Sequence, residues 1–151
     1  MTLSGGLHEK PDAPASKQKV ERMAQSAPTC LVVEDAAFDR MIMERKLAAY
    51  AQPLQVRFVS TLAEARNCLS EMPISIIFLD NSLPDGKGAN FALELAAHRN
   101  WMKIPVVMVS DWPSPFMPAK AKAANVVAIW TKTEFTALTV AEVLKSRGLT
   151  A

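Results

Sequence analysis

The sequence predicts one α/β domain whose core is a doubly wound, five-stranded parallel sheet with helices on both faces. From Thr29 onward, five short apolar runs alternate with longer amphipathic stretches, which is the order expected of a repeated βα unit. The runs are apolar at nearly every position, as in parallel strands that helices cover on both faces. No segment recurs at a fixed period, so a repeat array is not expected.

The strands are predicted where apolar residues follow one another, and the helices where apolar residues recur every three or four positions. The strand ranges are 30–33, 55–59, 74–79, 105–109 and 126–130. The helix ranges are 38–50, 62–71, 89–99, 119–124 and 134–146, of which the fourth is short.

Threonines are predicted to begin two of these helices. Thr61 and Thr133 each stand just before an apolar periodic run, and a hydroxyl at this position can accept a bond from a free backbone N–H. Glu64 completes a capping box with Thr61. In the first helix, Phe38 and Leu47 contribute to a broad apolar side that we expect to pack on the sheet.

Composition limits the classes of protein to consider. Of 151 residues half are apolar, and 17 Lys and Arg stand against 15 Asp and Glu. This content is too apolar for a chain disordered throughout, and a formal net charge of +2 does not indicate nucleic-acid binding. No run is long enough for a membrane-spanning helix and no secretion signal is found, so we expect a cytoplasmic protein without membrane contact.

The N-terminal segment differs from the rest of the chain. Residues 1–28 combine prolines and glycines with scattered polar residues, and they are predicted to form a flexible tail before a domain over residues 29–151. Within the domain, Cys30 and Cys68 have no second Cys or His at metal-ligand spacing. We therefore expect both cysteines to be small buried apolar residues.

Polar side chains follow four of the five predicted strands. Glu34 and Asp35 follow the first strand, Asp80 the third and Ser110 the fourth, and Lys132 lies just beyond the fifth. In a doubly wound sheet the ligand site lies beyond the carboxyl ends of the strands, so these side chains are expected to meet. Three carboxylates at close range raise one another's pKa unless a cation is present, and oxygen ligands of this kind favour Mg²⁺.

The same residues favour phosphoryl transfer. Beside the metal ion, Lys132 supplies positive charge for a phosphoryl group, and Ser110 supplies a hydrogen-bond donor. Asp80 is the candidate nucleophile, because a carboxylate can form an acyl phosphate by in-line attack.

Four segments carry a resemblance to a known family. They are Leu31-Val-Val-Glu34-Asp35, Ile76-Ile-Phe-Leu-Asp80-Asn-Ser-Leu-Pro84-Asp-Gly86, Val107-Met-Val-Ser110 and Trp130-Thr-Lys132. Over residues 29–147 the chain resembles a response-regulator receiver domain of two-component signalling, of the single-domain chemotaxis type. The spacings of 45 residues from Asp35 to Asp80, 30 to Ser110 and 22 more to Lys132 agree with that family. The resemblance implies a flavodoxin-like sheet with strand order 2-1-3-4-5.

The resemblance also implies a role for each residue of the site. Asp80 would accept a phosphoryl group from a histidine kinase or a phosphotransfer protein. Asp35 would bind Mg²⁺ directly, Glu34 would bind it through water, and the backbone carbonyl of Ser82 would be a further ligand. Lys132 would pair with Asp80 and then with a phosphoryl oxygen.

Output is expected to go through a protein partner. The resemblance implies that Ser110 moves toward the phosphate on activation, and no output module is found in the sequence. We therefore expect a stand-alone receiver that contacts a downstream protein, and self-association into a homodimer stays open.

The segment after Ser110 departs from the family. Three prolines lie within residues 111–118, so we expect an extended loop and a fourth helix of only one or two turns. This segment also holds three apolar residues that would be either local core or an exposed docking patch, namely Trp112, Phe116 and Met117.

Two further departures lie close to Lys132. Ile129 stands where the family has an aromatic switch residue, and Thr133 stands where the family has a proline. Alternation along the strand is expected to send Trp130 to the face opposite Ile129.

Two other functions compete with the receiver hypothesis. A hydrolase of the haloacid dehalogenase kind also uses an Asp nucleophile with Mg²⁺, but it needs a second Asp two residues later, where this chain has Ser82. The other alternative is an interaction module that keeps the receiver fold and signals without phosphorylation.

Overall fold

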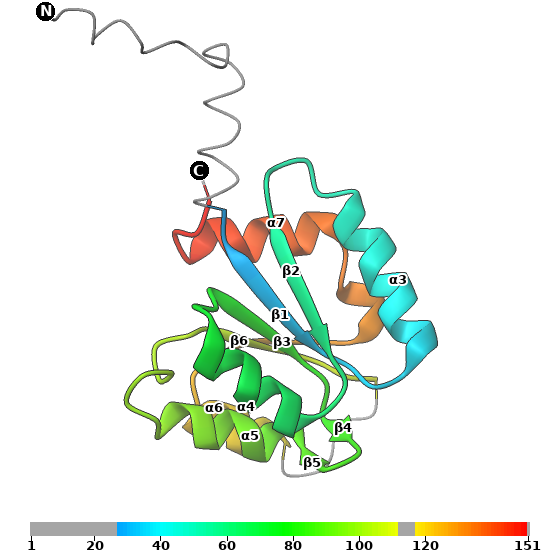
Figure 1. Cartoon of the computed structure of the whole chain (residues 1–151). Helices are drawn as coiled ribbons and strands as arrows, with labels where there is room; N and C mark the ends of the chain where they lie inside the picture. Colours follow the sequence, from blue (N-terminus) through cyan, green and yellow to red (C-terminus); the bar gives the residue numbers. More distant parts are fainter. Residues whose placement is uncertain (1–26, 112–116, 151) are drawn as a thin grey trace, which may run out of the picture.

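The structure is a computed structural model of the whole chain, of which residues 27–111 and 117–150 are described here. Most of the predicted tail, together with Trp112 and Phe116, lies outside the described residues. The core is a five-stranded sheet (Figure 1). Its strands are β1 (Thr29–Val33), β2 (Gln55–Val59), β3 (Ile76–Leu79), β6 (Val106–Val109) and β7 (Val126–Trp130). Their order is β2-β1-β3-β6-β7 and every neighbouring pair is parallel, which confirms the predicted order 2-1-3-4-5.

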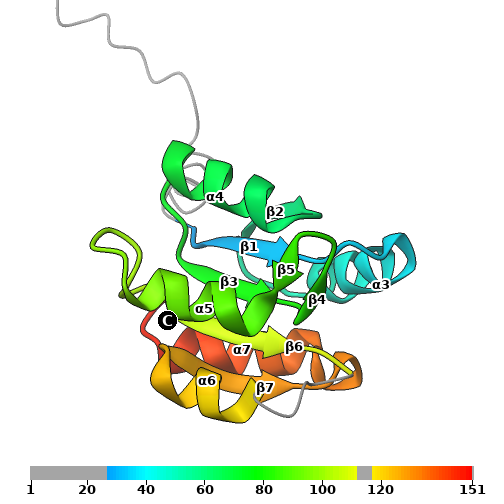
Figure 2. The same cartoon turned by 90° about the horizontal axis from the view of Figure 1, so that it is seen from below.

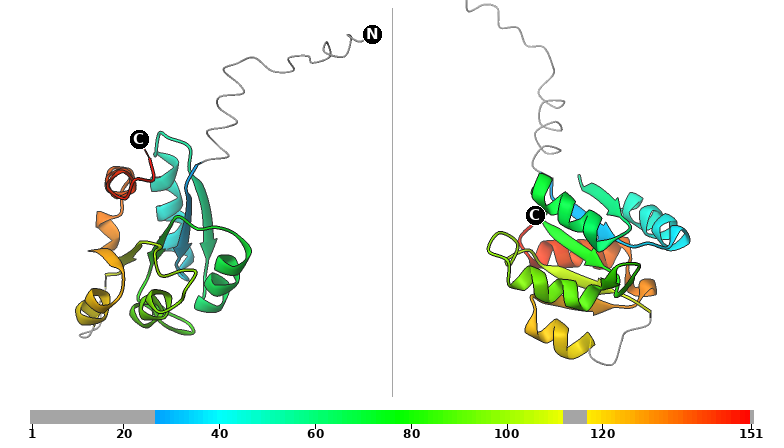
Figure 3. Two further views of the ribbon diagram at one scale, coloured as in Figure 1. Left: turned by 90° about the vertical axis from the view of Figure 1, so that its left-hand side faces the viewer. Right: turned by 60° about the horizontal axis from the view of Figure 1, so that its bottom comes forward.

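Helices cover both faces of the sheet (Figures 2 and 3). One face carries α3 (Ala37–Ala48) and α7 (Ala137–Ser146), and the other carries α4 (Leu62–Glu71), α5 (Gly88–Ala96) and α6 (Met117–Ala123). Two shorter pieces complete the fold, an antiparallel hairpin of β4 (Ser82–Leu83) with β5 (Gly86–Lys87) and a 3₁₀ turn over Lys132–Glu134. None of these helices is long and apolar enough to cross a membrane.

The sheet separates two apolar cores. Alternate residues of each central strand point to opposite faces, so Ile77 and Leu79 pack under α4 and α5, whereas Ile76 and Phe78 pack under α3 and α7. Every residue of β3 and β6 is buried, as expected for strands covered on both sides. Burial of apolar surface on both faces therefore holds the carboxyl ends of β1, β3 and β6 in one row.

Two sequence-based predictions about helices are wrong. The last helix was expected over residues 134–146 but begins at Ala137 with Thr136 as its N-cap, because Glu134 belongs to the separate 3₁₀ turn over Lys132–Glu134. Thr133 therefore caps no helix. In α3, Phe38 is 66% exposed because the buried face is set by Met43 and Leu47, and Phe38 lies about 140° around the helix from Met43.

The structure confirms several smaller expectations. Thr61 and Glu64 form a capping box at the start of α4, and Cys30 and Cys68 are free and buried. Burial raises the pKa of the Cys30 thiol to about 12. The fourth helix, α6, has only seven residues.

The structure also places Met117, Ile129 and Trp130, which lie in segments that depart from the family pattern. Met117 is buried in the core beneath α6, which favours the core alternative for this residue of the proline-rich segment. Ile129 is half-exposed, whereas Trp130 lies against Phe78 with ring centroids 6.0 Å apart and contacts Phe135. The predicted alternation of Ile129 and Trp130 is thus confirmed.

The hairpin after β3 is tied to the start of α4. The Asp85 carboxylate accepts bonds from the backbone N–H groups of Leu62 and Ala63, at 2.9 and 3.0 Å. Helix N-termini present such unpaired donors, and a negative charge there is favourable. These bonds, the one from Leu62 above all, lower the pKa of Asp85. The carboxylate thereby fixes the chain that follows β3.

Gly88 allows the chain to pass close to the end of β3. A Cβ placed on Gly88 would collide with the backbone carbonyl oxygen of Asp80 and press on Asn81. Since both contacted groups are backbone, they cannot swing aside as a flexible side chain could. The side chain of Asn81 adds a bond from the N–H of Ala89, at 3.0 Å, which fixes the start of α5.

We expect Asp85→Asn to lower the urea midpoint of unfolding at pH 7, because the amide group accepts one of the two N–H bonds at most. Since the folded-state pKa of Asp85 is lowered, its contribution is complete above the unfolded value of 3.8 and is lost as pH falls through the folded value. The difference between variant and parent should therefore shrink toward pH 3. Glu142→Gln, an exposed carboxylate on α7, is the control. A difference that is the same at both pH values would contradict this account.

We expect Gly88→Ala to be less stable than the parent by roughly 1–3 kcal/mol, the usual cost of forcing atoms into a filled space. In an exposed helix the same change would instead stabilise the protein by up to about 1 kcal/mol. Urea unfolding decides between the two signs, with Lys87→Ala as the neighbouring exposed control. Unchanged or increased stability of Gly88→Ala would show that the contact with Asp80 does not constrain the chain.

Candidate functional site

Three carboxylates meet at the carboxyl ends of two neighbouring strands. Glu34 and Asp35 follow β1, and Asp80 follows β3, which pairs with β1 in parallel. One carboxylate oxygen from each residue lies within 4.8 Å of the other two. Glu34 and Asp80 are buried, whereas Asp35 is exposed. We call these three residues the acidic cluster.

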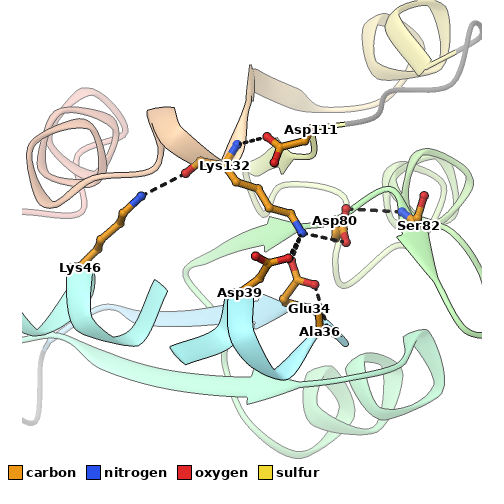
Figure 4. Close-up of polar contacts among 8 residues, drawn as sticks. All are labelled: Glu34, Ala36, Asp39, Lys46, Asp80, Ser82, Asp111 and Lys132. Atoms are coloured by element: carbon orange, nitrogen blue, oxygen red, sulfur yellow. Dashed lines mark hydrogen bonds and ion pairs between the residues drawn. The ribbon is translucent and has the colours of Figure 1, made fainter. Parts of the chain in front are cut away.

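Lys132 reaches the acidic cluster from the 3₁₀ turn after β7 (Figure 4). Its ammonium Nζ lies 2.9 Å from Glu34 Oε1 and 3.7 Å from Asp80 Oδ2. The carboxylate nearest to Nζ belongs to Asp39, which lies in the first turn of α3 and is not part of the acidic cluster, at 2.6 Å. The ammonium thus forms its shortest contacts with Asp39 and Glu34, not with Asp80, the partner that the resemblance implies.

Burial and pairing set the charges of this group. Burial raises the pKa of Glu34, and the bonds that its carboxylate accepts from Lys132 and from the N–H of Ala36 oppose this rise. Burial also opposes the charge of Lys132, but hydrogen bonds to Asp39 and Glu34 overcome it and raise the pKa of the ammonium. Lys132 is therefore fully charged at neutral pH.

The main chain of Lys132 also has two hydrogen-bond partners (Figure 4). Its N–H donates to Asp111 Oδ1 at 2.8 Å, and its carbonyl oxygen accepts from Lys46 Nζ at 3.2 Å. Although Thr133 replaces the family's proline, these two bonds fix the turn, and no peptide bond among the described residues is cis.

Ser110 and Ser82 lie at the ends of the strands that flank the cluster. Ser110 is buried just after β6, the strand beside β3, and its N–H donates to the carbonyl oxygen of Trp130 at 2.9 Å. The N–H of Ser82 points to Asp80 Oδ1 at 3.5 Å. All six residues singled out from the sequence therefore lie at one edge of the sheet.

Sequence reasoning missed three residues that contact Lys132, namely Asp39, Lys46 and Asp111. The position of Asp39 in the first turn of a predicted helix, five residues after Glu34, was a usable signal. Asp111 directly follows Ser110 and could have been noticed in the same way. Nothing local marks Lys46, because its contact with Lys132 spans 86 positions of the chain.

The acidic cluster has the donor set of a hard divalent cation. Mg²⁺ prefers oxygen ligands and is commonly bound by one or two carboxylates with water completing its shell. Glu34, Asp35 and Asp80 supply carboxylate oxygens at mutually close range, and Asp35 faces solvent, where an ion can enter. No His or Cys belongs to this group, so a softer metal is not favoured.

Comparison with known proteins gives one family and many similar structures. Residues 30–142, well over half of the chain, match the model of the response regulator receiver domain. A search of curated proteins gives no match. Among solved structures, the phosphorylated cyanobacterial phytochrome response regulator RcpA is 21% identical, covers 83% of this chain and 96% of its own, and has a TM-score of 0.70.

Two further structures extend this likeness. The Mn²⁺-bound form of response regulator Rcp1 is 19% identical, with 81% of this chain and 94% of its own covered and a TM-score of 0.67. A CheY-like receiver domain protein from Methanospirillum hungatei JF-1 is 16% identical, with 81% and 97% covered and a TM-score of 0.69. At these identities the structures establish the fold. Together with the match to the family model they show that this chain belongs to the response-regulator receiver domain family.

Proposed function

We propose that the chain is a receiver that accepts a phosphoryl group on Asp80 from a histidine kinase or a phosphotransfer protein. The observation that carries the proposal is the charged Lys132 ammonium, which lies 2.9 Å from Glu34 Oε1 and 3.7 Å from Asp80 Oδ2 at the carboxyl ends of the parallel strands. A part-buried ammonium beside a buried carboxylate is an arrangement suited to a phosphoryl group that forms there.

Phosphorylation would form one bond at the Asp80 carboxylate and break one in the donor. One carboxylate oxygen of Asp80 attacks the phosphorus and forms an O–P bond, while the bond from phosphorus to the donor breaks and its electron pair leaves with the donor. Lys132 neutralises charge on the phosphoryl oxygens, and the N–H of Ser82 faces the same carboxylate. Ser110 supplies a hydroxyl at the end of the neighbouring strand.

Charge balance supports dependence on Mg²⁺. Glu34, Asp35, Asp39 and Asp80 face the single positive charge of Lys132, so the local formal charge is −3 before a dianionic phosphoryl group arrives. Like charges at this range repel strongly in a part-buried site. Held by the acidic cluster and the Ser82 carbonyl, Mg²⁺ would offset this repulsion and polarise the phosphoryl oxygens.

The product is proposed to act through a protein partner. A phosphoryl group that binds one arrangement of Ser110 and the following segment better than another would shift a pre-existing equilibrium toward that arrangement. We propose a signalling phosphoacceptor and not a hydrolase, because Ser82 stands where the hydrolase mechanism needs a second Asp.

A second candidate is a receiver-like interaction module that works without phosphorylation. The observation in its favour is that Lys132 Nζ lies nearer to Asp39 than to Asp80, at 2.6 against 3.7 Å. In this case Lys132 would serve to neutralise the buried acids and hold the fold, and no donor would modify Asp80.

Acetyl phosphate with Mg²⁺ distinguishes the two candidates. We expect the mass of the intact protein to increase by one phosphoryl group, and Asp80→Asn to remain unlabelled because an amide oxygen is a poor nucleophile. Chelation of the metal should abolish labelling, and Glu142→Gln should be labelled like the parent. No labelling of the folded parent by acetyl phosphate or a small phosphoramidate, or equal labelling of Asp80→Asn, would favour the interaction module.

A further inference from the structure

Asp39 is the closest partner of the Lys132 ammonium. The distances from Nζ are 2.6 Å to Asp39 Oδ2, 2.9 Å to Glu34 Oε1 and 3.7 Å to Asp80 Oδ2. Figure 4 shows the lysine side chain ending between Asp39 and Glu34, with Asp80 to one side. Charge-assisted N–H···O bonds are about 2.7–2.9 Å long, so the first two contacts are hydrogen bonds and the third is an electrostatic contact.

The two carboxylates that hold the ammonium differ in exposure, so loss of the ammonium would cost the buried Glu34 more free energy than the part-exposed Asp39. The Glu34 side chain is 2% exposed, so without Lys132 it would be a buried charge lacking its main partner. The Asp39 side chain is 30% exposed and lies in the first turn of the twelve-residue helix α3. Water and the helix dipole would stabilise the Asp39 charge after Lys132 had left.

The movement available to Lys132 is confined to its side chain. Asp111 holds its N–H and Lys46 holds its carbonyl oxygen, so the backbone of the turn is fixed. The Lys132 side chain is 20% exposed, and its ammonium is at the end of a flexible four-carbon chain. A shift of this group from Asp39 toward Asp80 therefore requires only rotation of side-chain bonds.

We propose that Asp39 is a positioning residue that holds Lys132 in the resting state and releases it to the phosphoryl group on Asp80. The inference rests on the proposed function of Asp80. A dianionic phosphoryl group attracts the ammonium more strongly than the solvated Asp39 carboxylate does, while Glu34 keeps its bond throughout. Because the resting bond to Asp39 must be given up, its free energy opposes phosphorylation and sets the fraction of chains in which Lys132 faces Asp80.

Binding of beryllofluoride with Mg²⁺, a stable stand-in for the phosphoryl group, tests the proposal. We expect Asp39→Asn to bind roughly two- to fivefold more tightly than the parent, the factor expected for loss of one part-exposed ion pair. Glu44→Gln removes an exposed carboxylate from the same helix without touching Lys132, and it should bind like the parent. Affinity that is unchanged or weaker in Asp39→Asn would overturn the proposal.

A second measurement separates release of Lys132 from a general loss of negative charge. The ¹⁵N and ¹H signals of the Lys132 ammonium, recorded without any phosphoryl analogue, should shift in Asp39→Asn and stay unchanged in Glu44→Gln. On adding beryllofluoride, the parent signal should move in the same experiment. An Asp39→Asn signal identical to that of the parent would also overturn the proposal.

The role of Asp80 and the role of Asp39 can fail independently in these measurements. If the parent and Asp80→Asn bind beryllofluoride alike, the assignment of Asp80 as phosphoacceptor fails. The ammonium signals without beryllofluoride still show in that case whether Asp39 holds Lys132. If the parent binds beryllofluoride through Asp80 but Asp39→Asn changes neither reading, only the role of Asp39 fails.

Discussion

Two carboxylates buried at the edge of the sheet are the constraint on which this site depends. Glu34 and Asp80 lie side by side with almost no exposed surface, so burial and the neighbouring Asp80 charge both raise the pKa of Glu34. Lys132 supplies the compensating positive charge from a third strand end. Because an unpaired buried charge is costly, the positions of β1, β3 and the turn after β7 are linked through one ammonium group.

The doubly wound sheet provides this arrangement without any special local structure. Parallel strands point the same way, so polar residues that end the apolar runs all emerge at one edge. The order β2-β1-β3-β6-β7 places the residues after β3 next to those after β1 on one side and those after β6 on the other. Apolar packing on both faces then fixes the distances between strand ends, and the charged groups are added to a rigid frame.

Contacts around the site restrict how the charged groups can move. Gly88 lets the start of α5 lie against the Asp80 carbonyl, and Asp85 joins the hairpin after β3 to α4. On the other side, Asp111 and Lys46 fix the backbone of Lys132. The backbone on both sides is thus held in place, and the Lys132 side chain can respond to a change in charge without moving it.

The sequence was sufficient for the fold and for the residues that end its strands. Apolar runs and helical periodicity are local properties, so the five strands, the strand order implied by the resemblance and the Thr61 cap could be predicted from short segments. Glu34, Asp35, Asp80, Ser110 and Lys132 could be found because each directly follows or closely follows an apolar run. The errors lie at helix starts, where Thr136 and not Thr133 caps α7, because a 3₁₀ turn competes with the helix for the same residues.

Only the tertiary structure decided how the charges pair. Asp39 is 93 positions from Lys132 and Lys46 is 86 positions away, and no local pattern encodes contacts of that separation. The choice of Asp39 over Asp80 as nearest partner depends on side-chain reach and solvent exposure, which are known only once the helices are packed. The hydrophobic pattern of the sequence determines where strands end, whereas ion pairs depend on the distances between charged side chains after the elements have packed.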